Sequence, residues 1–158
     1  MKDSLKMGIG FGITSGTITT LGLIVGLYSG TLSRLAIVGG VFTIAIADAF
    51  SDSVGLHLSK KFVNKDSRKE IWTSTLSTFI SKFFIAISFL IPIIIFPLQK
   101  AVIISIIWGF TILSLFSFCI AKIQRKKAWP TILEHTATAL IVVITTQIMG
   151  QIIRKFFA

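Results

Sequence analysis

Two acidic residues lie inside a stretch that is otherwise apolar enough to cross a membrane. Residues 36–61 read AIVGGVFTIAIADAFSDSVGLHLSKK and contain Asp48 and Asp52. A carboxylate at the centre of a membrane helix costs about 3 kcal/mol on the milder scales. Residues four apart share one face of a helix, and two such acids resist ionising together unless a proton or a cation neutralises them. The pattern therefore favours a site that binds or moves a cation within a membrane.

The composition supports a chain that is embedded in a membrane. Of the 158 residues, 53% are hydrophobic and 14% are charged, whereas a soluble domain has about a quarter charged residues. Apolar runs such as 83–98 and 101–121 are long enough for membrane helices. We therefore expect an all-α integral membrane protein, with one domain over residues 1–158 and five transmembrane helices. The expected helices cover about 8–29, 35–58, 71–98, 101–121 and 131–153.

The basic residues predict the orientation of these helices. The net charge is +10, and Lys and Arg cluster at the ends of the apolar segments, eleven on one side and four on the other. The larger group is Lys2, Lys6, Lys60, Lys61, Lys65, Arg68, Lys69, Lys122, Arg125, Lys126 and Lys127, and the smaller group is Arg34, Lys100, Arg154 and Lys155. The positive-inside rule then places the N-terminus in the cytoplasm and the C-terminus outside.

The same placement of charge predicts the partners and the location of the chain. Basic residues at helix ends meet anionic lipid head groups, so we expect a lipid bilayer and no nucleic acid as partner. The expected location is the cell membrane, crossed several times, or an internal membrane in a eukaryotic cell. Lys82 lies within the third segment, and we expect its side chain to extend towards the cytoplasmic surface.

Depth estimates from the helix rise bring several oxygen ligands to one level. Asp48 lies about 20 Å from the external boundary, at 1.5 Å per residue, and Ser15 reaches a similar level from the cytoplasmic side. The expected metal- or proton-binding residues are Thr14, Ser15, Thr19, Asp48, Asp52 and Glu134, with Thr138 beside them. Such oxygens suit Mn²⁺, Mg²⁺ or Fe²⁺. The alternative is that the two acids only pair with Lys82 or bond to helix hydroxyls.

Glycines recur at every fourth position in the first segment. Gly8, Gly12 and Gly16 form one series, and Gly22, Gly26 and Gly30 form another. Small residues at this spacing let a second backbone approach closely. Two interpretations stay open, namely ordinary helix packing and a helix beside a two-fold axis or an ion pathway.

Three segments resemble those of a known family. The first contains GITSGTITTLGLIVGL, which resembles the first-helix signature of the vacuolar iron transporter family, and LEHTATALIVVITTQIMGQIIRK resembles its fifth helix. The second segment is similar to the family's second helix, in which a Met and a Glu stand at the positions of Asp48 and Asp52. The resemblance implies a homodimer with an ion pathway between the two first helices. It also implies export of Fe²⁺ or Mn²⁺ from the cytosol in exchange for protons.

The chain departs from the family pattern at three places. Ser15 stands where the family has an Asp before Gly, and Asp48 replaces the family's Met. The loop between the second and third segments is short and basic, whereas many members carry a Glu-rich metal-binding insert there. The resemblance thus implies a short form whose carboxylate has moved from the first helix to the second. A ligand set without Met is harder and consists of oxygens alone.

These observations together predict a function. We expect a divalent metal cation transporter that exports Fe²⁺ or Mn²⁺ from the cytoplasm by exchange with protons, with the metal as substrate and no tightly bound cofactor. The alternatives are a non-transporting accessory or structural membrane protein and a transporter of another cation. We expect no enzymatic activity. An intramembrane aspartyl protease needs acids on facing helices, whereas Asp48 and Asp52 share one helix.

Overall fold

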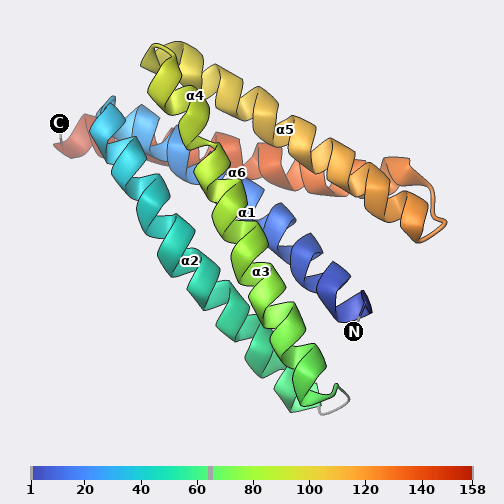
Figure 1. Cartoon of the computed structure of the whole chain (residues 1–158). Helices are drawn as coiled ribbons and strands as arrows, with labels where there is room; N and C mark the ends of the chain where they lie inside the picture. The colour runs from blue at the N-terminus through green and yellow to red at the C-terminus, as the bar shows by residue number, and fades with distance from the viewer. Residues whose placement is uncertain (1, 64–65, 158) are drawn as a thin grey trace.

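The computed structural model describes residues 2–63 and 66–157, and every regular element among them is a helix. The helices are α1 (Lys2–Thr31), α2 (Arg34–Val63), α3 (Arg68–Ser88), α4 (Leu90–Ile95), α5 (Leu98–Ile123) and α6 (Ala128–Phe157) (Figure 1). Five helical units are long and apolar enough to cross a membrane, with α3 and α4 together forming the third. The expected all-helical fold is thus confirmed, and the five units indicate a multi-pass membrane protein.

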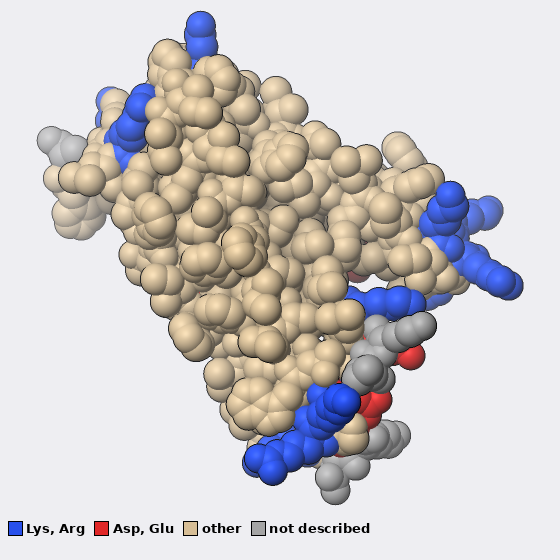
Figure 2. Space-filling model, in the orientation of Figure 1, with Lys and Arg blue, Asp and Glu red and all other residues tan. Residues whose placement is uncertain are grey.

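The outer surface has the character of a surface that faces lipid. Large apolar side chains such as Phe50, Leu76 and Ile107 are more than half exposed. Figure 2 shows Lys and Arg gathered at the ends of the molecule, with an uncharged surface along the length of the helices between them. A soluble protein rarely exposes apolar patches of this extent, so the surface agrees with the expected placement in a bilayer.

The helices are longer than the ranges expected from apolarity alone. α1 begins at Lys2 and α2 continues to Val63, beyond the expected limits of residues 8 and 58. Thirty residues of helix span about 45 Å, whereas the hydrocarbon core of a bilayer is about 30 Å thick. The additional turns carry polar and basic residues, so they extend the bundle beyond the apolar layer or accompany a tilt of the helices.

The third helical unit breaks at Phe89 and ends before Pro97. Pro92 has no N–H to donate to the carbonyl one turn earlier, and the N–H of Phe89 bonds to the Ala86 carbonyl at 3.2 Å, a tighter turn than an α-helix makes. Phe96 is extended (φ −103°, ψ 159°), as a residue before proline usually is. Pro92 therefore accompanies the break in this unit, and Pro97 follows its end.

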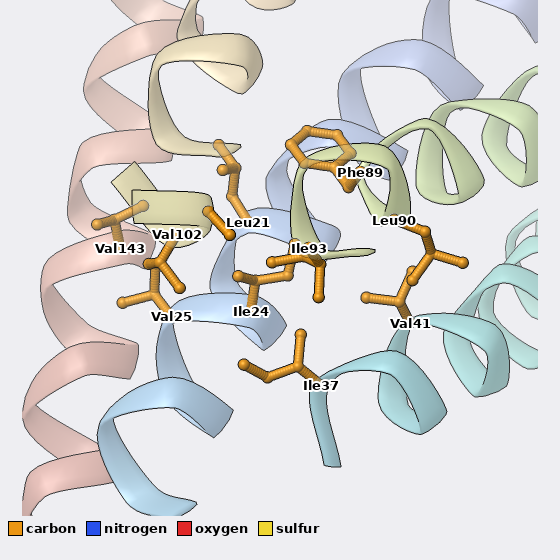
Figure 3. Packing of buried hydrophobic residues seen from close by; sticks show 11 residues of the cluster. Leu21, Ile24, Val25, Ile37, Val41, Phe89, Leu90, Ile93, Val102 and Val143 are labelled. Carbon is orange, nitrogen blue, oxygen red and sulfur yellow. The ribbon is translucent and has the colours of Figure 1, made fainter. Parts of the chain in front are cut away.

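The helices converge at one end of the molecule and spread apart at the other. In Figure 1, the α2–α3 pair and the α5–α6 pair diverge towards their connecting turns, and the N-terminus of α1 lies between the two pairs. Apolar side chains fill the end where the helices converge (Figure 3), including Leu21, Ile24, Ile37, Phe89 and Ile93. The C-terminal half of α1 therefore packs against apolar residues of α2, α4, α5 and α6. The polar contacts of α1 with other helices lie in its N-terminal half.

The first glycine series of α1 lets that helix lie directly against α3. A Cβ atom at Gly12 would lie 2.7 Å from the Thr78 carbonyl oxygen and 3.0 Å from the Lys82 backbone nitrogen. A Cβ atom at Gly16 would lie 3.1 Å from Cγ of Lys82. Real side chains do not approach backbone so closely, so only glycine permits this packing at Gly12.

The second glycine series packs against α6. A Cβ atom at Gly22 would lie 2.7 Å from the Val142 side chain, and one at Gly26 would lie 3.5 Å from Cβ of Thr146. Both series thus pack within one chain, which agrees with the interpretation as ordinary helix packing. The same faces of α1 are covered by α3 and α6, so they do not lie open for a second copy.

We predict that Gly12→Ala lowers the free energy of unfolding by about 1–3 kcal/mol, because the new methyl group must push α1 away from α3. Gly10→Ala is the matched control on the same helix, since a Cβ atom there would lie 3.7 Å from the Phe116 side chain, an ordinary contact distance. Denaturant unfolding of both variants in mild detergent measures the difference. Equal stability of the two variants would contradict the close approach of α1 and α3.

Candidate functional site

Three helices bring their central residues together. Ser15 is the fourteenth of the 30 residues of α1, and Asp48 is the fifteenth of the 30 residues of α2. Lys82 is the fifteenth of the 28 residues of the third spanning unit, Arg68–Ile95. Each residue thus lies near the middle of its helix, remote from both ends of a helix that is long enough to span a membrane. Charged groups at this level require partners.

The partners of these residues are one another. Nζ of Lys82 lies 2.7 Å from Oδ2 of Asp48 and also pairs with the carboxylate of Asp52. The same ammonium group donates to Oγ of Ser15 at 2.9 Å, and the Ser15 hydroxyl donates to Oδ2 of Asp52 at 2.7 Å. We call Ser15, Asp48, Asp52 and Lys82 the charge cluster. It joins one ammonium group, two carboxylates and one hydroxyl from three helices.

The charge cluster is buried unevenly and is not electrically balanced. The Lys82 side chain is only 2% exposed, whereas those of Asp48 and Asp52 are 29% and 25% exposed. With all three groups ionised, the cluster carries one net negative charge. A proton or a cation is needed to neutralise it in a medium of low dielectric constant. The cluster therefore has the charge that binding of a positive ion requires.

The position of Lys82 differs from the expected extension towards the surface, whereas its contacts agree with the stated alternative that the two acids pair with Lys82. Its side chain does not extend towards the surface but lies fully within the bundle, where its stem contacts the glycine face of α1 at Gly16. The side chain can turn inwards because two carboxylates compensate the cost of burying its charge. The signal was present in the sequence, since a single basic residue in the middle of one span should match unpaired acids in the middle of another.

The remaining expected ligands are not drawn into the charge cluster. The Thr19 hydroxyl donates to the Ser15 carbonyl at 2.9 Å, and the Thr138 hydroxyl donates to the Glu134 carbonyl at 2.8 Å, so each bonds to its own helix. Glu134 is exposed on α6, and Thr14 is half-buried on α1. Within residues 2–63 and 66–157, no polar side-chain contact links Thr14 or Glu134 to the cluster. The third contributing helix is therefore α3, whereas the sequence had suggested the last span.

The acids could supply only part of the coordination sphere of a metal ion. Across the described residues, no group of three or more His, Cys, Asp or Glu side chains lies close enough to hold a metal. The available oxygens are those of Asp48, Asp52 and Ser15, and Lys82 already contacts all three residues. A bound metal would thus have to displace the ammonium group and complete its shell with water or with ligands from another molecule.

The side of α2 beside the acids is made of small residues. They recur at every fourth position, all exposed, and are Gly39, Thr43, Ala47, Ser51 and Gly55. Ala47 and Ser51 directly precede the two acids in the chain. Small residues at this spacing allow another helix to approach closely. We call this face the α2 strip, and it borders the exposed edge of the charge cluster.

Polar side chains continue along α3 from the charge cluster towards the α2–α3 turn. Ser74, Thr75, Ser77 and Thr78 are buried there, and each hydroxyl bonds to a carbonyl of its own helix. Nδ1 of His57 lies 3.1 Å from the Thr75 hydroxyl. The hydroxyls are thus satisfied without water, and His57 stands at the end of this row, one turn beyond Asp52.

Comparison with models of protein families, with curated proteins and with solved structures gave no match to this chain. The similarity of three segments to vacuolar iron transporters therefore stays a resemblance. The function has to be argued from the charge cluster and its place in the bundle.

We predict that Lys82→Met lowers the free energy of unfolding by about 3 kcal/mol, because it leaves two half-buried acids without a counter-charge. The triple variant Asp48→Asn, Asp52→Asn, Lys82→Met removes all three charges and should regain most of the loss. Denaturant unfolding in mild detergent measures both effects. Lys100→Met is the matched control at an exposed lysine. If the Lys82 and Lys100 variants are equally stable, the charge cluster does not stabilise the bundle.

Proposed function

We propose that this chain is a secondary transporter that exchanges a metal cation for protons across a membrane. The observation that supports the proposal is the charge cluster, which sets two partly exposed carboxylates in the middle of a chain with five apolar spanning helices. Ionisable residues at such a depth usually mark ion pathways or proton relays. A cluster with one uncompensated negative charge suits this role.

The coupling of cation to proton follows from the cost of charge at this depth. Asp48 and Asp52 offer the same oxygens to a proton and to a metal cation, so the two compete for one site. A site at the centre of a bilayer resists both surplus negative and surplus positive charge. Binding of a cation therefore favours release of a proton, and return of the site with protons bound completes the exchange.

We propose a divalent metal ion, Fe²⁺ or Mn²⁺, as the substrate, exported from the cytoplasm. Carboxylate and hydroxyl oxygens from Asp48, Asp52 and Ser15 are hard ligands of the type that Mn²⁺ accepts. The resemblance of α1 to the first helix of vacuolar iron transporters supports the same cargo and direction. The distribution of basic residues supports a cytoplasmic N-terminus, an external C-terminus and anionic lipid at the basic turns.

We further propose that the transporter is a homodimer that associates through the α2 strip. The glycines of α1 already pack against α3 and α6, so they are not free to form the axis that the family resemblance implies. The α2 strip is exposed and borders the acids. A second copy placed on it would shield the exposed edges of Asp48 and Asp52 from lipid, where a carboxylate is costly.

We predict that Asp48→Asn abolishes proton flux driven by a gradient of Mn²⁺ or Fe²⁺ in proteoliposomes, because one of the two exchangeable carboxylates is lost. A pH-sensitive dye trapped in the vesicles measures the flux. Asp66→Asn is the matched control, since Asp66 pairs with Lys60 at 3.0 Å next to the α2–α3 turn. Full flux through the Asp48 variant would refute the proposed site.

A second candidate function is a non-transporting membrane protein in which the charge cluster only holds helices together. The observation in its favour is that Lys82 pairs with both acids and with Ser15. This candidate predicts no metal-driven proton flux through the unaltered protein. The liposome assay therefore separates the two functions before any variant is made.

We predict that Ala47→Cys, introduced after Cys119→Ser, forms a disulfide-linked dimer when the protein is oxidised in membranes. Ala47 lies on the α2 strip near the middle of α2, so two copies would bring the thiols together. Phe84→Cys is the control at an exposed position on α3 and should stay monomeric. Non-reducing electrophoresis measures the yield, and equal yields for both variants would contradict the α2 interface.

A further inference from the structure

The ammonium group of Lys82 stands where a transported cation would bind. It lies 2.7 Å from Oδ2 of Asp48 and 2.9 Å from Oγ of Ser15, and it pairs with Asp52. These three residues are the oxygen donors that the cluster offers to a cation. The ammonium group therefore occupies the position for which the cargo would compete.

We propose that Lys82 is a tethered cation, which fills the site while no cargo is bound and which the cargo displaces. This inference rests on the proposed function, because it assigns a role to Lys82 in the same site. The lysine stem is fixed to α3 and buried to 98% by the bundle, so a displaced ammonium group remains inside the bundle and can return to the carboxylates. Cargo binding is then an exchange of one cation for another.

The exchange explains how a site for a divalent ion can exist at this depth. With Lys82 in place, the cluster carries one net negative charge. Once the ammonium group has moved off the carboxylates, Asp48 and Asp52 together match the charge of a divalent cation, and the displaced ammonium group needs an acceptor of its own. The empty transporter thus never exposes two uncompensated carboxylates, which would be costly in a medium of low dielectric constant. The competition also lowers the apparent affinity, which allows the cargo to leave.

A buried hydroxyl on α1 is a candidate acceptor for the displaced ammonium group. Thr20 is fully buried, and its hydroxyl has no hydrogen-bond partner among the described residues. It lies one turn after Gly16 on the same face of α1, and a Cβ atom at Gly16 would lie 3.1 Å from Cγ of Lys82. A hydroxyl oxygen accepts a hydrogen bond from an ammonium group. We infer that Thr20 receives Lys82 when cargo is bound.

Mn²⁺ binding to the purified full-length protein tests this role. The paramagnetic resonance signal of free Mn²⁺ measures the affinity at fixed pH. Lys82→Gln should bind Mn²⁺ at least about tenfold more tightly than the unaltered protein, because the competing charge is gone. Lys82→Arg keeps the charge and should bind no more tightly than the unaltered protein. Equal or weaker binding by Lys82→Gln, or tighter binding by Lys82→Arg, overturns the proposal.

Thr20→Val tests the second position of the ammonium group. It should weaken Mn²⁺ binding several-fold in the presence of Lys82 and leave the affinity of the Lys82→Gln protein unchanged. Thr17→Val is the matched control, since Thr17 is also fully buried but its hydroxyl bonds to the Ile13 carbonyl at 2.7 Å. An equal effect of Thr20→Val in both backgrounds excludes Thr20 as the second position.

The outcomes distinguish this proposal from the proposed function. Both the transport function and the role of Lys82 are overturned if Mn²⁺ binds neither to the unaltered protein nor to the Lys82→Gln protein. The same holds if Mn²⁺ binds equally well after Asp48→Asn and Asp52→Asn. If binding depends on the two acids and is the same with and without Lys82, only the role of Lys82 is overturned. Should Lys82→Gln fail to elute as a single species in detergent, Thr20→Val in the unaltered background decides the question, because displacement of Lys82 predicts weaker Mn²⁺ binding there than with Thr17→Val, and equal binding by these two variants overturns the proposal.

Discussion

The pairing of Lys82 with two acids at the middle of the bundle is the interaction on which the rest of the structure depends. Three ionised groups at that level are acceptable only if they meet, and they come from α2 and α3 with Ser15 of α1 between them. α1, α2 and α3 must therefore keep one register relative to one another. Burial of a charge pair gives little net stability but penalises every arrangement that separates the partners.

The register of α1 and α3 is possible because glycine replaces side chains where the two backbones approach. Gly12 and Gly16 face Thr78 and Lys82, so the lysine stem lies against α1 rather than against lipid. At the other end of α1, apolar side chains such as Leu21 and Ile24 pack against α2, α4 and α5 (Figure 3). The molecule thus joins an apolar half, which fixes the helices, to a polar half, which carries the charge cluster.

The α2 helix shows how one sequence serves several environments. Residues at every fourth position face the same way, so α2 presents four different faces. Two of them are the acids and the α2 strip. The third is a buried series (Ala45, Ala49 and Ser53), and the fourth is a series of large exposed apolar residues (Phe42, Ile46, Phe50, Val54 and Leu58). The acids lie between the buried series and the α2 strip. Their half-buried position is therefore a property of the helical repeat, and it leaves one side of the proposed cation site facing the α2 strip.

Most of the fold could be predicted from the sequence, because membrane helices are encoded by local composition. Runs of about 20 apolar residues give the five spans, and Pro92 and Pro97 give the break and the end of the third. Apolarity alone predicts helices that are too short, because α1 and α2 continue into polar turns at their ends. Of the expected site residues, Ser15, Asp48 and Asp52 meet in the structure, whereas Thr14, Thr19 and Glu134 do not join them.

The sequence by itself determined that this chain is helical, that it has five apolar spans and that two acids lie at the middle of the second. It offered Lys82 as one possible partner of those acids but could not decide between the partners, because a helical repeat fixes the facing of side chains within one helix and not the rotation of one helix against another. The tertiary structure decided that Lys82 turns inwards to Asp48 and Asp52. The physical reason is that contact between opposite charges and close packing on glycine are both properties of pairs of helices.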